Sequence, residues 1–154
     1  MNGTVAQSLS ESIALGDEPG LNTAAGHDDS MHLALHAIVE GTATATGTDF
    51  FYALVRELAL TLHVRYAFVS ELLESKTRVR TLAFWFDGQF IDNIEFDLDG
   101  TPCEVVIRGE TVYYTHKVYE MFPHHPELRD MGIESYFGVP LVSESGNDMM
   151  GHLA

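Results

Sequence analysis

The sequence has few basic residues, one cysteine and no long apolar run. Its 154 residues contain 8 Lys and Arg against 23 Asp and Glu, which gives a formal net charge of −15. So acidic a chain repels phosphate backbones and anionic lipid headgroups, and we expect neither a nucleic-acid partner nor a membrane partner. No Lys or Arg precedes Arg56, and no apolar run approaches the roughly 20 residues that span a bilayer. These absences predict a cytoplasmic protein.

Cysteine occurs once, at Cys103, which excludes an internal disulfide and a CxxC metal site. The sequence also shows no nucleophile beside a base, no paired carboxylates and no glycine-rich phosphate loop. We therefore expect a protein that is not an enzyme and has no catalytic residues. The residues identify no cofactor.

Two regions of the chain differ in composition. Residues 1–30 mix Ser, Gly, Asp, Glu, Asn and Ala without a period and contain no Lys or Arg. Such a segment cannot bury enough apolar surface to offset the entropy of ordering it, so we predict a disordered acidic N-terminal segment. Residues 31–154 carry regular apolar patterns and are long enough for one domain with a core.

Apolar spacing predicts two helices at the start of this domain. The first runs from Met31 to near Gly41. The second has an apolar stripe along 50–62, with Thr48 as its N-cap and Asp49 in its positive first turn. Alternating β-branched and aromatic residues predict strands over 66–73, 79–86, 91–98, 134–142 and 149–154, and a short extended piece at 113–114.

The segment after Gly100 carries the start signal of a helix. Thr101 is the N-cap and Pro102 occupies the first helical position. Glu104 follows three residues after the cap, where its carboxylate can accept the N–H of the cap residue itself. Gly109 ends the helix.

Three segments in the second half of the chain carry a resemblance to a known family. They are Gly-Thr-Pro-Cys-Glu at 100–104, Gly-Ile-Glu-Ser-Tyr-Phe-Gly-Val-Pro-Leu at 132–141 and Gly-His-Leu-Ala at 151–154. With these segments, the region 31–154 resembles a GAF domain. The resemblance is to the bacterial signalling branch, as found in sensor kinases and related multidomain regulators.

The resemblance implies an α/β fold of the α+β, GAF/PAS-like kind. Its central antiparallel sheet has about five or six strands, with helices on one face and a crossover segment, residues 100–132, on the other. GAF domains usually continue past the last strand into a further helix. The resemblance therefore also implies that the GAF-like domain, residues 31–154, is truncated before its C-terminal helix.

The resemblance implies a sensory or regulatory function in bacterial signal transduction. The domain would bind a small molecule, or relay a conformational signal, and so control an output domain of the same protein outside this sequence, such as the histidine kinase of a two-component system. The alternative is a ligand-free GAF-like module for dimerisation or spacing. A homodimer formed through helices is expected in either case.

Aromatic residues give the best indication of where a ligand would bind. Phe84 and Phe86 share one face of a strand by the period of two, and several tyrosines come from the region that covers the sheet in GAF domains. Core packing explains each ring equally well, so both interpretations stay open. The predicted ligand-binding residues are Phe84, Phe86, Cys103, Tyr113, Tyr114, Phe122 and Tyr136.

Cys103 also has two interpretations. A thiol in the first turn of a helix can ionise more easily, but Glu104 beside it opposes a thiolate and the chain has no resolving cysteine. A structural role is therefore favoured over a reactive one. The Cys-His pair by which bilin-binding GAF domains attach their chromophore is absent.

Three histidines lie close together in the sequence, at His116, His124 and His125. Their spacing is not diagnostic of a metal site, and adjacent histidines generally point apart, so solvated histidines are favoured over a metal site. We expect solvated histidines on a surface loop and no metal ion.

Overall fold

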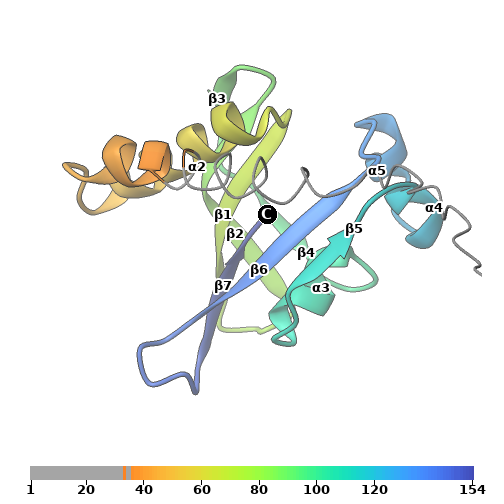
Figure 1. Cartoon of the computed structure of the whole chain (residues 1–154). Coiled ribbons are helices and arrows are strands. Elements are labelled where there is room, and N and C mark those ends of the chain that lie inside the picture. The colour runs from red at the N-terminus through yellow and green to blue at the C-terminus, as the bar shows by residue number, and fades with distance from the viewer. Residues whose placement is uncertain (1–32, 34–35) are drawn as a thin grey trace, which may run out of the picture.

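The computed structural model describes residue 33 and residues 36–154, so the predicted disordered segment, 1–30, lies outside the described residues. Figure 1 shows one sheet with helix α2 against one face and three short helices on the other side. The elements are α2 (Thr48–Leu62), β1 (Tyr66–Leu72), β2 (Arg78–Phe86), β3 (Gln89–Ile91), β4 (Glu95–Asp97), α3 (Pro102–Ile107), β5 (Val112–Tyr114), α4 (Val118–Met121), α5 (Pro126–Asp130), β6 (Tyr136–Val142) and β7 (Met149–Leu153). Within the described residues, no helix has the length and apolar character needed to cross a membrane.

All strand pairs in the sheet are antiparallel, and the strand order is β3-β2-β1-β7-β6-β5, with β4 also paired to β2. The sheet therefore has seven strands rather than five or six. The single strand predicted over 91–98 is wrong, because this region forms β3 and β4 with a break between them. At the break, Thr81 Oγ1 accepts the Ile94 N–H at 2.9 Å and Asn93 donates to the Leu82 carbonyl at 3.1 Å. A backbone bond from the Thr81 N–H to the Ile94 carbonyl remains at 2.9 Å, and these side-chain hydrogen bonds add to it.

Helix α2 begins one residue earlier than a Thr48 cap would require, because Thr48 is itself the first helical residue. Gly47 occupies the cap position with φ 60°, and no side chain caps the helix there. The predicted Thr48 cap is therefore wrong, while Asp49 does lie in the first turn. The stripe on α2 buries Val55 and Ala59 against β1 and β2. Residues 36–42, the described part of the predicted first helix, are also helical.

The alternation of β1 and β2 divides the side chains between two cores. The core on the α2 face consists of Val55, Ala59, Ala67, Val69, Ala83 and Trp85. The core on the other face contains Val79, Leu98 and Cys103, with Phe68 and Phe96 packed against it. The crossover from α3 to α5 covers this second face, as the family resemblance implies (Figure 1).

Helix α3 begins as its sequence predicts. Thr101 is the N-cap, its hydroxyl accepts the Glu104 N–H at 3.2 Å, and Pro102 opens the helix. The carboxylate of Glu104, however, accepts the N–H of Gly100 at 3.0 Å. The N–H of Thr101 instead bonds to the carbonyl of Leu98, so that donor is not free for a reciprocal cap.

Two glycines are required where other segments pass close to the sheet. A Cβ on Gly138 would collide with Val106 of α3 and with the hydroxyl of Tyr136. A Cβ on Gly151 would clash with the carbonyl oxygen of Ser70 on the neighbouring strand. The glycines of the 132–141 and 151–154 segments thus let α3 and β1 approach β6 and β7.

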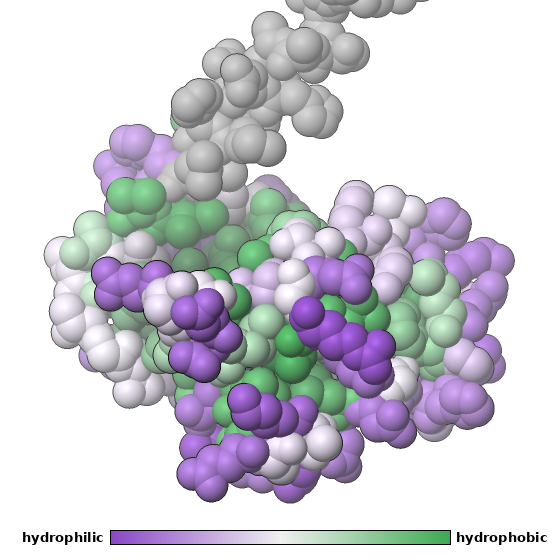
Figure 2. All heavy atoms as spheres, turned by 90° about the horizontal axis from the view of Figure 1, so that it is seen from below, coloured by the Kyte–Doolittle hydropathy of each residue, from purple (hydrophilic) through white to green (hydrophobic). Residues whose placement is uncertain are grey.

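Large apolar side chains also remain on the surface, as the space-filling view shows in green between hydrophilic residues (Figure 2). Leu60 and Leu62 of α2 are each 54% exposed, and Tyr113 of β5 is 69% exposed.

Candidate functional site

A cavity of about 1060 Å³ opens where strand β7 ends. The pairing of β6 with β7 reaches only to Val139 opposite Leu153, whereas the first residues of β6 pair with β5. The cavity lies beside the start of β1 and the last residues of β7, and it continues beneath the crossover.

Aromatic rings form much of the cavity wall on the crossover face. The ring centroid of Phe68, on β1, lies 5.4 Å from that of Phe84 and 6.1 Å from that of Phe96. Helix α2 contributes Leu58 and Leu62 at one end of the cavity. Leu128 of α5 also lines the cavity, as do Met131 and Ile133 of the segment between α5 and β6.

The structure places the seven predicted ligand-binding residues in two groups. Phe84, Cys103, Tyr113 and Tyr136 line the cavity, and Phe86, Tyr114 and Phe122 are absent from its lining. Phe86 does lie on the same face as Phe84, but it stacks on Tyr66 with ring centroids 4.9 Å apart. Tyr114 packs against Phe122 at 5.7 Å. Ligand binding by any of the seven stays a prediction.

Cys103 lies in the wall as a neutral, hydrogen-bonded thiol. It is only 6% exposed, and the hydroxyl of Tyr136 donates to its Sγ at 3.4 Å. Burial raises the pKa of the Cys103 thiol to about 11, outweighing the hydrogen bonds from Tyr136 and Thr101 that lower it. Burial also raises the pKa of Tyr136. A protonated buried thiol is a poor nucleophile, which favours the structural interpretation of Cys103.

The basic side chains of the cavity wall are paired with carboxylates. Arg65 lies 3.7 Å from Asp87, and Arg78 lies 3.3 Å from Glu95 and 3.2 Å from Asp97. Arg65 also lies over the ring of Tyr66 at 5.5 Å. Both guanidinium groups are therefore held by acidic partners.

His125 lies at the rim of the cavity and is not a solvated histidine as predicted. Its side chain is 18% exposed, its Nδ1 lies 2.7 Å from the Glu127 carboxylate, and its Nε2 lies 2.8 Å from the Asp99 carbonyl oxygen. Burial lowers the pKa of His125, but the hydrogen bonds to Glu127 and Asp99 outweigh it, so the pKa is raised. His125 thereby ties the start of α5 to the turn before α3. His116 and His124 are exposed.

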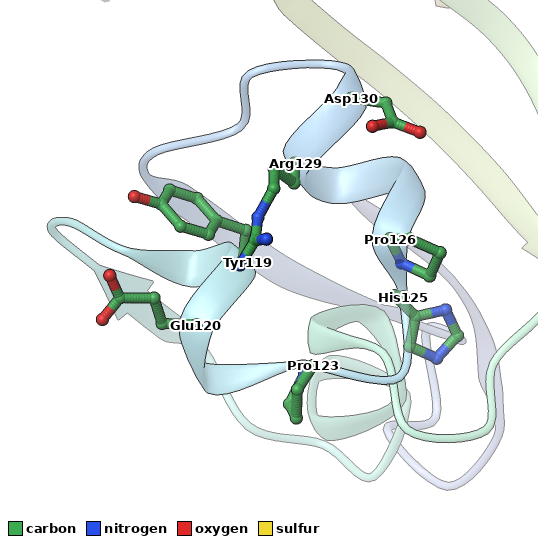
Figure 3. Close-up of a pocket in the computed structure, with 7 residues that line it drawn as sticks. All are labelled: Tyr119, Glu120, Pro123, His125, Pro126, Arg129 and Asp130. Carbon is green, nitrogen blue, oxygen red and sulfur yellow. The ribbon is translucent and has the colours of Figure 1, made fainter.

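A second, smaller hollow of about 420 Å³ lies between α4 and α5 (Figure 3). The guanidinium of Arg129 lies over the ring of Tyr119, 5.3 Å from its centroid. Glu120, His125 and Asp130 complete a mainly polar lining. Helix α4 was not predicted, because its four residues are too few to show a helical period.

The structure also brings together a serine and a histidine that sequence reasoning missed. Ser70 Oγ lies 2.6 Å from His152 Nδ1, and the two residues are 2% and 0% exposed. Burial lowers the pKa of His152 to about 4, and its Nε2 has no hydrogen-bond partner among the described residues. A pair so enclosed has no access to a substrate, so it links β1 to β7 and is not a catalytic pair. The only sequence signal was the position of His152 in the 151–154 segment.

Within the part of the chain that the structure describes, no three His, Cys, Asp or Glu side chains are grouped to hold a metal ion.

Comparison with known proteins identifies the fold. No protein-family model and no curated protein matches the chain. The GAF domain of A. aeolicus NLH2, solved in an inactive state, superposes with a TM-score of 0.60 at 14% identity, over 82% of this chain and 78% of that one. The GAF domain of an Acinetobacter phosphoenolpyruvate-protein phosphotransferase superposes with a TM-score of 0.59 at 19% identity, over 81% and 74%. The chain has the fold of a GAF domain.

Proposed function

We propose that this chain is the sensory domain of a bacterial signal-transduction protein, in which a small molecule binds in the cavity at the end of β7. The bound molecule would control an output domain of the same protein. The GAF fold supports a regulatory role in general, and the cavity supports ligand binding in particular.

The single observation that carries the proposal is the cavity itself. Its volume of about 1060 Å³ and its aromatic wall suit a small organic ligand, because such sites are mostly apolar and enclose roughly 300–1,000 Å³. Four of the residues selected from the sequence line this one cavity: Phe84, Cys103, Tyr113 and Tyr136.

The position of the cavity provides a route for the signal. The segment that covers the cavity continues directly into β6, and β6 pairs with β7. The last residue of the sequence, Ala154, exchanges backbone hydrogen bonds with Phe68, a ring in the cavity wall. A ligand that favours one arrangement of this covering segment would shift the equilibrium between arrangements of the sheet edge, which is what a sensor requires.

The alternative is a ligand-free module that dimerises through helices, and exposed side chains favour it specifically. Leu60, which is exposed and lies outside the cavity lining, gives α2 apolar surface that a second chain would cover in a dimer. In that case the cavity would have no ligand and the domain would act by holding two chains together.

A blocking substitution separates these two functions. Ser135 is an exposed residue of the cavity lining, so Ser135→Trp should fill part of the cavity without disturbing a buried contact. Ser145→Trp, in the turn between β6 and β7, is the matched control outside the lining. We expect compounds that raise the melting temperature of the parent and of Ser145→Trp to lose that effect on Ser135→Trp, because a ligand stabilises only the state that binds it. A library without a stabilising compound, or hits that survive Ser135→Trp, would support the ligand-free alternative.

A further inference from the structure

We propose that the ligand of this cavity is an aromatic cation, such as an aryl-substituted amine, and that Glu134 is its counter-ion. This inference rests on the function proposed above and specifies the chemical class of the molecule that is sensed.

The first part of the argument is the aromatic wall. Phe68, Phe84 and Phe96 lie in one continuous group on the crossover face. Tyr136 lines the same cavity, whereas the ring of Tyr66, also in the lining, is already stacked on Phe86 and has Arg65 over it. The faces of aromatic rings carry negative electrostatic potential, so they attract a cation while their carbon surface packs against an apolar body. A cavity walled in this way favours an aromatic ligand and is compatible with positive charge.

The second part is the balance of charges around the cavity. Its lining contains Arg65, Arg78 and His125 against four carboxylates, those of Glu95, Asp97, Glu127 and Glu134. Each basic group lies beside a carboxylate: Arg65 beside Asp87 outside the lining, Arg78 beside Glu95 and Asp97, and His125 beside Glu127. An anionic ligand would compete with these carboxylates and would meet excess negative charge, which disfavours it.

The third part is the position of Glu134. Among the described residues, no Lys, Arg or His forms an ion pair with its carboxylate. Its backbone is fixed, because its carbonyl accepts the Val118 N–H at 3.1 Å. Glu134 is exposed, stands two residues before Tyr136 and belongs to the cavity lining, so among the described residues a carboxylate without an ion-pair partner borders the rings. Glu127, in contrast, is held by His125.

A matched set of three probes tests the class of ligand. The probes are 2-(1-naphthyl)ethylamine, 2-(1-naphthyl)ethanol and 1-naphthylacetate, which share one aromatic body and differ in charge. Titration calorimetry on the full chain at neutral pH measures each affinity. We expect the amine to bind about tenfold more tightly than the carboxylate, and the alcohol with intermediate affinity. Added salt should reduce the difference in affinity between the amine and the carboxylate.

Two variants locate the counter-ion. Glu134→Gln should lower the affinity for the amine about threefold, the effect expected for an exposed carboxylate. The affinity for the alcohol should not change. Glu144→Gln removes one carboxylate in the turn between β6 and β7, outside the cavity lining, and should change neither affinity.

The outcomes distinguish this inference from the function on which it rests. If the carboxylate binds as tightly as the amine, or if none of the probes binds at millimolar concentration, the proposed ligand class is wrong. The sensory function would still stand if some other compound stabilises the parent and loses its effect on Ser135→Trp. If Glu134→Gln and Glu144→Gln lower the affinity for the amine equally, the effect comes from the net charge of the protein, and Glu134 is not the counter-ion.

Discussion

The buried imidazole of His152 makes the free energy of unfolding depend on pH. In the folded protein its pKa is lowered to about 4 by burial, against an ordinary value of 6.5. Above the ordinary value the ring is neutral in both the folded and the unfolded chain, and it adds no pH dependence. As the pH falls from 6.5 towards 4, His152 binds a proton in the unfolded chain but stays neutral in the folded chain. The free energy of unfolding therefore falls through this window.

His152→Gln tests this effect at the level of one residue. From about pH 7 to about pH 5, the parent should lose about 2 kcal/mol more of its free energy of unfolding than the variant does, because one pKa unit corresponds to about 1.4 kcal/mol. Urea unfolding at the two pH values measures the loss of free energy of unfolding in the parent and in the variant. Carboxylates titrate alike in the two proteins and cancel in the comparison. An equal loss in parent and variant would mean that His152 can be protonated in the folded state.

Residue patterns alone could not separate the wall of a cavity from a packed core. Phe84 and Phe86 share a face, as their spacing predicts, yet only Phe84 lines the cavity. The difference comes from Tyr66 on the next strand, which stacks on Phe86. No spacing within one strand indicates which ring on the neighbouring strand will cover it. The same limit applies to Ser70 and His152, which are 82 residues apart in the chain.

Among the elements, helix α3 offers the clearest link from sequence to stability. The hydroxyl of Thr101 accepts the Glu104 N–H at 3.2 Å and donates to the Leu98 carbonyl at 2.6 Å. Thr101 is 8% exposed, so these groups would have little water to replace the lost bonds. The cap thus joins α3 to the end of the segment that follows β4.

Thr101→Ala should lower the free energy of unfolding by about 1–2 kcal/mol, the usual cost of removing an N-cap. Thr101→Ser keeps the hydroxyl and should recover most of the loss. Thr77→Ala removes a threonine hydroxyl at an exposed position and serves as the surface control. Thermal and urea melts measure all three. If Thr101→Ala is no less stable than Thr77→Ala, the hydroxyl of Thr101 does not stabilise the helix.

Elements determined by local chemistry were predicted well, and those determined by distant contacts were not. The start of α3 follows from a cap and a proline that are neighbours in sequence. The break between β3 and β4 depends on hydrogen bonds from Asn93 and Ile94, in the break itself, to Leu82 and Thr81 of β2. The cap of α2 depends on a positive φ at Gly47, and the apolar pattern gave no sign of it.

At the scale of the whole molecule, the antiparallel sheet and its two covered faces were predicted through the family resemblance. The cavity was not, because segments far apart in the chain form its wall, such as Phe68 of β1 and Tyr136 of β6. The two solved GAF domains share the fold at 14% and 19% identity, so the architecture tolerates extensive change of sequence.

The whole-molecule charge leads to a prediction about salt. A formal charge of −15 on 154 residues means that carboxylates repel one another across the surface, and folding brings them closer together. Ion pairs such as Arg80 with Glu71 oppose this repulsion, but they are exposed and few. Salt screens both the repulsion and the attraction, with a Debye length of about 10 Å at 0.1 M. Because acidic residues are in excess, the repulsion is the stronger of the two.

We therefore expect the melting temperature to rise when NaCl is increased from about 0.02 M to about 0.3 M, because screening relieves more repulsion than attraction. KCl at the same concentrations is the control and should have the same effect, since screening depends on ionic strength and not on the cation. Thermal melts followed by circular dichroism measure the shift. The opposite result, a lower melting temperature at higher salt, would show that attractive pairs such as Arg80 with Glu71 and Arg78 with Asp97 outweigh the net negative charge. A rise with only one of the two salts would indicate binding of that cation at the acidic surface rather than screening.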